Sequence, residues 1–112
     1  MSIEGVWRVE MLGPYGWEKV AIAFMQNGQY LAASADHHTV GRYEEDGEKI
    51  ELKTQITQHG KTRTIFGETK KKVEMRIEGK QKKSGKIVGL AHPADNRDFE
   101  VKVRLTRLEK LD

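Results

Sequence analysis

The chain has 112 residues, of which 37% are hydrophobic and 33% charged, and its formal net charge is +3. This length fits one domain and leaves little for a second, so the sequence predicts a single domain over residues 1–112. No apolar run approaches the roughly 18 residues of a membrane span, and no secretory signal is visible. The chain contains no Cys, which excludes disulfides, thiolate metal ligands and cysteine nucleophiles. We expect a small soluble protein of the cytoplasm.

Apolar and polar residues alternate with a period of two in five segments, 7–11, 19–24, 49–56, 72–78 and 99–106. Such alternation is typical of half-buried antiparallel strands, and no segment keeps a period of 3.6 over 11 residues. In the second segment, Val20, Ile22 and Phe24 are expected to form the apolar face that points to the core. In the last segment, the inward row is expected to begin at Phe99.

Turn signals separate these segments at regular intervals. Asn27-Gly28 and Asp46-Gly47 contain residues that tolerate positive φ, which is the strongest short signal for a β-hairpin. Weaker strands are predicted at 29–34, 39–45 and 86–92. The sequence therefore contains about eight short strands that follow one another along the chain.

Residues 58–69 are predicted to form a longer connection, with a short extended piece at 64–66. Eight serially paired strands leave two open edges unless the sheet closes, so we expect an all-β fold, an eight-stranded antiparallel up-and-down barrel. A flattened barrel or a sandwich is the alternative. The inward residues are mostly medium-sized aliphatics, which favours a filled core over a ligand cage.

An acidic hairpin is the most specific candidate for a binding site. It carries the four carboxylates Glu44, Glu45, Asp46 and Glu48 around one turn. One interpretation is a solvated tip around an Asp-Gly turn, where water screens the repulsion. The functional interpretation is a landing site for a basic protein partner, which raises the association rate and specificity more than the affinity.

Positive charge is concentrated in the second half of the chain. Residues 1–56 hold 5 Lys or Arg against 9 Asp or Glu, a balance of −4, and residues 57–112 hold 15 against 8, a balance of +7. The basic cluster consists of Lys70, Lys71, Lys72, Lys80, Lys82, Lys83 and Lys86. Nucleic-acid modules interleave aromatic residues or Arg with such a patch, and few of either occur here, so the sequence favours lysines that protect turns and strand edges.

The sequence contains no arrangement that predicts catalysis or metal binding. His37 and His38 are adjacent and point to opposite faces of a strand, and no His-x-His spacing occurs. None of the serines lies in a Gly-x-Ser-x-Gly elbow. We therefore expect no enzymatic activity, no cofactor and no metal.

Gly5-Val6-Trp7 lies on the first predicted strand and resembles the Gly-x-Trp opening of calycins, the barrels of lipocalins and fatty-acid-binding proteins. The resemblance implies that Trp7 packs at the closed end of the barrel under an Arg from the last strand. Arg104 and Arg107 are the two candidates for that Arg.

Trp17 and Tyr30 are further candidates for the barrel end or for contact with a ligand. Trp17 follows a Gly-Pro turn, where an exposed aromatic ring would favour an interface or a ligand entrance. Ordinary packing at the rim is the alternative.

A series of short motifs along nearly the whole chain resembles the small bacterial proteins related to the negative regulator of type III secretion. The motifs are Gly5-Val6-Trp7-Arg8-Val9, Gly16, Asn27-Gly28-Gln29-Tyr30, Asp36, Val40-Gly41-Arg42-Tyr43, His59, Ile65-Phe66-Gly67 and Arg104-Leu105-Thr106-Arg107. The chain departs from the family pattern at Ala33-Ser34-Ala35-Asp36, which keeps the Asp but not the preceding glycines, and at Gly47, which interrupts the acidic run. The resemblance implies a calycin-like barrel, homodimers and a non-enzymatic regulator that holds a transcription activator through an acidic loop.

Two functions are therefore expected from different classes. The first is a regulatory protein-binding module that uses the acidic hairpin. The alternative is a carrier or sensor of a small apolar ligand in the barrel interior. A nucleic-acid binder that uses the basic half is less favoured than either, and no membrane partner is expected.

Overall fold

The computed structural model describes residues 3–59, 71–83 and 85–111, and these residues contain eight β-strands. The strands are β1 (Gly5–Gly13), β2 (Gly16–Gln26), β3 (Gln29–Ala33), β4 (His37–Asp46), β5 (Lys49–Gln58), β6 (Lys72–Lys82), β7 (Lys86–Pro93) and β8 (Val101–Lys110). The eight predicted strands are confirmed. The extended piece predicted at 64–66 lies outside the described residues.

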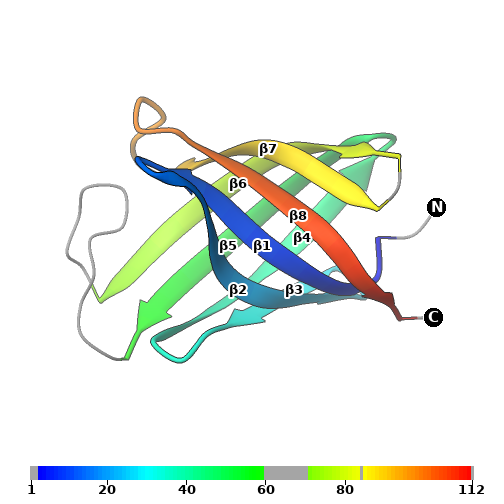
Figure 1. Cartoon of the computed structure of the whole chain (residues 1–112), viewed down its shortest axis with the longest axis horizontal. Coiled ribbons are helices and arrows are strands. Elements are labelled where there is room, and N and C mark those ends of the chain that lie inside the picture. The colour runs from blue at the N-terminus through cyan, green and yellow to red at the C-terminus, as the bar shows by residue number, and fades with distance from the viewer. Residues whose placement is uncertain (1–2, 60–70, 84, 112) are drawn as a thin grey trace.

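The strands form a closed barrel in which each strand pairs antiparallel with the next, and β8 pairs with β1 (Figure 1). The predicted all-β class and the up-and-down, calycin-like barrel are confirmed, and the open sandwich is excluded. Because the sheet is closed, neither the first nor the last strand has an unpaired edge, as expected from the sequence. Within the part of the chain that the structure describes, no helix has the length and apolar character of a membrane crossing.

The core fills the barrel with inward-facing side chains from all eight strands. Trp7 is its largest member and is 1% exposed. Ala23 on β2 lies opposite Trp7, and Ala32 on β3 lies opposite Ala23, so two small side chains adjoin the indole ring. The close packing of protein interiors requires such a match of large and small residues.

The predicted inward face of β2 is wrong. Ala23 and Met25 face the core with no exposed surface, whereas Ile22 and Phe24 point outward and are 39% and 48% exposed. The volume of Trp7 is the physical reason, because the neighbouring position on β2 has room only for a small side chain. The larger apolar side chains of this segment had favoured the face that contains Ile22 and Phe24.

A β-bulge in the pairing of β1 with β2 also changes which face each residue takes. Val9 lies opposite Ala21, but Glu10 lies opposite Lys19, so Val20 is an additional residue without a partner of its own. Between the start of β2 and the bulge, Trp17 and Lys19 point to the outer face of the barrel. The regular alternation predicted for 19–24 therefore ends within the segment.

Phe99 does not begin the last strand. β8 starts at Val101, and Phe99 lies in the preceding connection with 42% of its surface exposed. Its backbone N–H donates to the carbonyl oxygen of Asn96 over 3.4 Å. Phe99 therefore belongs to the turn around Asn96 and not to the strand that the alternating pattern predicted.

Gly5 permits the contact between β1 and β8 that closes the barrel. A Cβ atom at this position would overlap the carbonyl oxygen of Glu109 on β8. The two backbones can approach only because residue 5 has no side chain.

We predict that Ala23→Leu destabilises the fold, because the larger side chain would compete with Trp7 for the same space. Overpacking of this kind costs roughly 1–3 kcal/mol. Urea unfolding should therefore give a lower free energy of unfolding for the variant. The control is Ala35→Leu, which adds the same side chain at an exposed position of the connection between β3 and β4. Equal stability of the two variants would contradict the packing of Ala23 against Trp7.

Candidate functional site

Three of the four carboxylates of the acidic hairpin, those of Glu44, Glu45 and Asp46, belong to residues that line one groove, but their side chains do not all point to the same face of the sheet. β4 and β5 are joined by Gly47 and Glu48, and Gly47 has a φ of 63°. Since successive residues of a strand point to opposite faces, Glu44 and Asp46 lie on the outer face of the barrel. Glu45 lies opposite the buried residue Ile50 and therefore belongs to the other face.

Glu45 and Glu48 are instead connected to the end of β6. The Glu45 carboxylate accepts a hydrogen bond from the Gln81 side-chain amide over 3.2 Å. The Glu48 carbonyl oxygen accepts one from the Gln81 backbone N–H over 2.8 Å. These contacts hold the hairpin against β6, so Glu45 is partly engaged within the protein.

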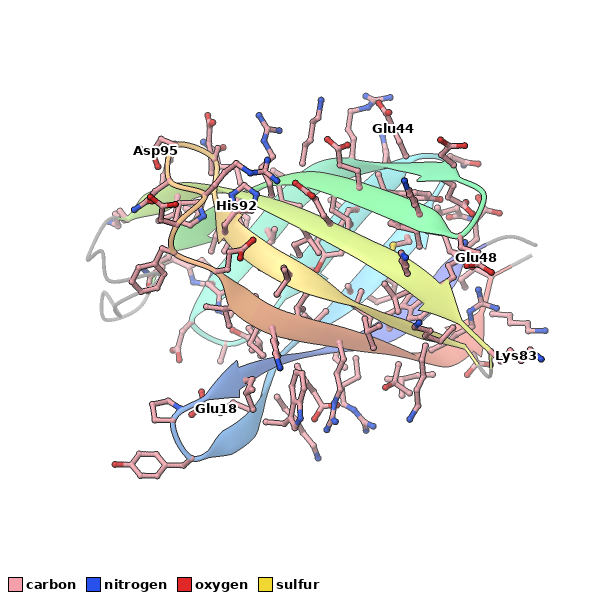
Figure 2. The ribbon with its side chains drawn as sticks, turned by 90° about the horizontal axis from the view of Figure 1, so that it is seen from above. Glu18, Glu44, Glu48, Lys83, His92 and Asp95 are labelled. Carbon is pink, nitrogen blue, oxygen red and sulfur yellow. The ribbon has the colours of Figure 1, made fainter. Side chains whose placement is uncertain are left out.

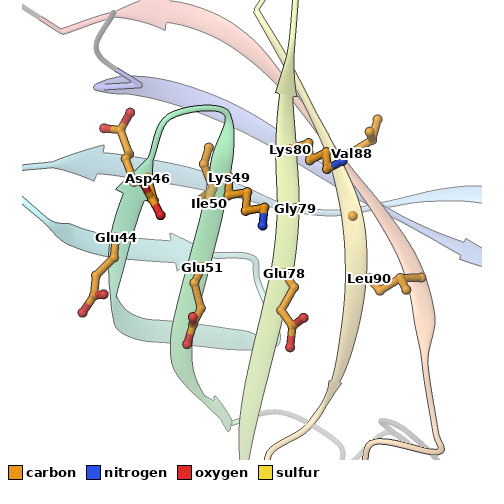
Figure 3. A pocket seen from close by; sticks show the side chains of 12 residues that line it. Glu44, Asp46, Lys49, Ile50, Glu51, Glu78, Gly79, Lys80, Val88 and Leu90 are labelled. Atoms are coloured by element: carbon orange, nitrogen blue, oxygen red, sulfur yellow. The ribbon is translucent and has the colours of Figure 1, made fainter.

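Glu44 belongs to a different acidic group, which we call the carboxylate row and which consists of Glu44, Glu51 and Glu78. Glu44 on β4 lies opposite Glu51 on β5, and Glu51 lies opposite Glu78 on β6. Figure 3 shows the three side chains directed to the same side of the sheet. Adjacent strands are about 4.8 Å apart, so the outer two members are separated by about 10 Å at the backbone.

Basic residues flank the carboxylate row on both sides. Two residues before Glu51 on β5, Lys49 lies opposite Lys80 on β6. Two residues after Glu51, Lys53 lies opposite Arg76. The Lys53 ammonium is 3.9 Å from Glu51, and both side chains are more than half exposed. An ion pair this exposed contributes little to stability, so Glu51 remains accessible to other cations.

The carboxylate row lines an open groove of about 610 Å³ on the outside of the barrel (Figure 3). The groove crosses β4, β5, β6 and β7, and Val88 and Leu90 provide an apolar wall on its β7 side. These two residues are 39% and 38% exposed. The groove therefore combines the carboxylate row and two further acidic residues, Glu45 and Asp46, with Lys49, Lys80 and an apolar surface.

Within the described part of the chain, Glu78 is the member of the row that contacts an arginine. Arg97, in the connection between β7 and β8, places its guanidinium Nη2 2.7 Å from Glu78 Oε1. This hydrogen bond is the largest cause of a lowered pKa of Glu78, which burial of the carboxylate opposes. The carboxylate row can therefore hold a guanidinium group.

Trp7 is buried in the core, and Arg107 on β8 is the arginine that lies over its ring. The Arg107 guanidinium carbon lies 5.0 Å from the centroid of the Trp7 ring. The indole N–H donates to the Ile3 carbonyl oxygen over 2.9 Å. The buried ring thus has its polar group satisfied and a cation over its face.

Arg104 lies over Trp17 rather than Trp7. Its guanidinium carbon is 4.2 Å from the centroid of the Trp17 ring on the outer surface. The same guanidinium donates to both carboxylate oxygens of Glu10, over 3.2 and 3.3 Å. Glu10 is only 7% exposed, and the hydrogen bond from Arg104 is the main cause of its lowered pKa.

Tyr30 is part of the barrel interior. It is 2% exposed, and burial raises the pKa of its phenol well above the ordinary value. It therefore remains a neutral core residue at physiological pH, and it does not adjoin the groove on the outer face.

The predicted basic cluster is divided between the two ends of β6. Lys72 begins β6 and Lys82 ends it, and β7 begins at Lys86. The 10 residue steps between Lys72 and Lys82 correspond to roughly 33 Å of strand. Lys70 lies outside the described residues. Figure 2 shows Lys83 at the end of the barrel opposite His92 and Asp95.

The histidines on β4 are engaged with nearby side chains. His37 Nδ1 is 2.7 Å from the Ser34 hydroxyl, and the His38 ring stacks on His59 with 5.4 Å between centroids. Across residues 3–59, 71–83 and 85–111, no three His, Asp or Glu residues are grouped so that they could hold a metal ion.

Sequence reasoning missed Glu51 and Glu78. Glu51 could have been found, because a two-residue connection at Gly47-Glu48 pairs Asp46 with Lys49 and therefore Glu44 with Glu51. Glu78 could not, because the long connection before β6 gives no register for its pairing with β5.

The comparisons with known proteins give no assignment. No protein-family model matches the chain, and no curated protein matches it. The geometry of the outer face is therefore the basis for a functional proposal.

We predict that Arg104→Gln raises the pKa of Glu10 towards its ordinary value of 4.5 and destabilises the fold at neutral pH. The loss should be about 1–3 kcal/mol, the usual contribution of a hydrogen bond to a charged group. Because the folded-state pKa of Glu10 is lowered, this stabilisation is present above pH 4.5 and is lost as the pH falls through the folded-state value.

Urea unfolding of both proteins between pH 7 and pH 3 measures the effect. The difference in free energy of unfolding should shrink in acid. Lys102→Gln, which removes one charge from the same strand, is the control and should change stability little. A difference between wild type and Arg104→Gln that is independent of pH would contradict the contact with Glu10.

Proposed function

We propose that this protein is a non-enzymatic protein-binding module whose outer groove receives a basic segment of its partner. The observation that supports this most directly is the carboxylate row, in which Glu44, Glu51 and Glu78 lie side by side across three strands and line an open groove. Positive side chains of the partner would neutralise the row, and apolar side chains of the same partner would pack on Val88 and Leu90.

The arrangement of the row has an energetic cost for the free protein. Like charges directly opposite each other on neighbouring strands are destabilising, and Glu51 has such a neighbour on both sides. A basic partner would remove this repulsion when it binds. The attraction would also steer the partner to the groove and would weaken with added salt.

The class of partner comes from the family resemblance. The best-known member of the family that the chain resembles represses by holding a transcription activator, and an acidic run on a surface loop is tied to that contact. We extend this to the present chain as a proposal, with the contact surface moved from the hairpin tip to the groove that begins at Glu44. On this proposal the protein acts as a regulator in the cytoplasm.

The alternative function, a carrier of a small apolar ligand, has less support. Side chains with no exposed surface face no space that a water molecule could enter. Core residues of this kind come from five strands and include Ala23, Met25, Leu52, Ile77, Ile87, Ala91 and Leu105. At these positions the interior is occupied by the protein itself.

The proposed module is a homodimer that associates through the outer face of β2 and β3. In the paired segments 22–26 and 29–33, every outward residue is uncharged, and Phe24 lies directly opposite Leu31. Phe24 and Leu31 are each 48% exposed. A second copy can cover the uncharged surface of these two segments, which Arg8 borders on β1 and Arg42 borders on β4.

We predict that Glu44→Gln/Glu51→Gln weakens binding of fluorescein-labelled hexa-arginine about 2–30-fold, because exposed charge pairs contribute about 0.2–1 kcal/mol each. Fluorescence anisotropy at low salt gives the dissociation constants. The melting temperature should be unchanged or higher, since the variant loses like-charge neighbours.

The control is Glu18→Gln/Glu109→Gln, which makes the same change in net charge on β2 and β8, away from the groove. Equal effects of the two double variants would mean that hexa-arginine responds only to overall charge. That result would exclude the groove as the binding site.

We predict that Leu31→Glu converts the dimer to a monomer in sedimentation velocity, because the substitution places two carboxylates in the proposed interface. Leu12→Glu introduces the same charge on another exposed Leu and should leave the dimer intact. A wild-type chain that sediments as a monomer at high micromolar concentration would refute the dimer.

A further inference from the structure

The connection between β7 and β8 folds back towards the carboxylate row. It begins with a hydrogen bond from the Ala94 N–H to the Glu74 carbonyl oxygen, over 3.0 Å, and turns around Asn96, whose side chain accepts from the Asp98 N–H over 3.1 Å. Arg97 follows this turn and reaches Glu78 on β6. Part of the chain itself thus occupies one end of the acidic row.

A buried histidine lies next to the same carboxylate. The His92 side chain is 3% exposed, and its Nδ1 is 2.7 Å from the Pro93 carbonyl oxygen. A carbonyl oxygen only accepts hydrogen bonds, so Nδ1 carries the proton. Figure 2 shows Asp95, a residue of the connection, at the same end of the barrel as His92.

The second ring nitrogen of His92 has no hydrogen bond among the described residues. Nε2 lies 3.6 Å from Glu78 Oε1 and is buried. In the neutral ring this nitrogen is an acceptor directed at a carboxylate, which also only accepts. A buried polar atom without a hydrogen bond is thus directed at the same carboxylate oxygen that Arg97 contacts.

We propose that Arg97 is an internal competitor for the arginine of a partner, so that the connection 94–100 limits access to the carboxylate row until a partner displaces it. This inference rests on the proposed function. Arg97 shows which chemistry the row accepts, because a guanidinium already binds there. It also identifies the partner's group as arginine, whose planar fork matches a carboxylate better than the ammonium of lysine.

The competitor is held weakly enough to be displaced. The Arg97 and Glu78 side chains are 67% and 50% exposed, so solvent screens their attraction. Removing Arg97 should strengthen binding of an arginine ligand by about two- to fivefold, the range expected for one exposed ion pair.

The experiment measures hexa-arginine binding to wild type, Arg97→Gln and Arg76→Gln by fluorescence anisotropy. Arg76 lies on β6, opposite His92, so its replacement removes the same charge from the same region. We expect the gain for Arg97→Gln to exceed that for Arg76→Gln. It should disappear in Arg97→Gln/Glu78→Gln, and it should be smaller when hexa-lysine replaces hexa-arginine.

Two outcomes separate this inference from the proposed function. If Glu44→Gln/Glu51→Gln weakens binding but Arg97→Gln and Arg76→Gln behave alike, the groove binds arginine and the internal competitor is refuted. If the double variant has no effect, the proposed function fails as well.

A second readout does not depend on binding. If Arg97 contacts Glu78 in solution, the pKa of the Glu78 carboxyl measured by NMR should rise in Arg97→Gln, since the main cause of its lowering is removed. An unchanged value would overturn the inference.

Discussion

The pairing of β1 with β8 around the buried ring of Trp7 is the constraint on which the rest of the structure depends. Gly5 allows the two backbones to approach, and Arg107 on β8 covers the indole face. Because the sheet closes, each strand has a defined inner and outer face and a fixed register with two neighbours. The positions of the surface carboxylates follow from this closure.

The carboxylate row illustrates that dependence. Glu44, Glu51 and Glu78 are distant in the sequence, and they come together because β4, β5 and β6 pair in one particular register. A shift of one residue in β6 would turn Glu78 inward and end the row. The barrel therefore acts as a rigid support, and the groove on its outer surface provides the chemistry. A fold of this kind is compatible with many functions, so the proposal depends on the row and not on the barrel.

Sequence periodicity predicted the strands well because each has one dry face and one wet face, which leaves a strong alternating signal. It failed where volume or local geometry decided the outcome. The neighbour of Trp7 on β2 had to be small, so Ala23 displaced the larger residues from the core. The turn at Asn96 removed Phe99 from β8.

The site was only partly predictable for a related reason. The acidic hairpin was visible, and its tight turn implies that Glu44 lies opposite Glu51. Alternation turns the Glu45 side chain away from that of Glu44, although both residues line the groove. The contribution of Glu78 and its contact with Arg97 depend on long-range pairing, which a single sequence does not encode in any short pattern.

The most direct test of this account is an NMR titration of the ¹⁵N-labelled protein with hexa-arginine at low salt. The account predicts chemical-shift changes in the outer segments of β4, β5, β6 and β7 that line the groove, and their reversal on addition of salt. Changes centred on Trp17 and the opposite face of the barrel, or no saturable change at all, would contradict it.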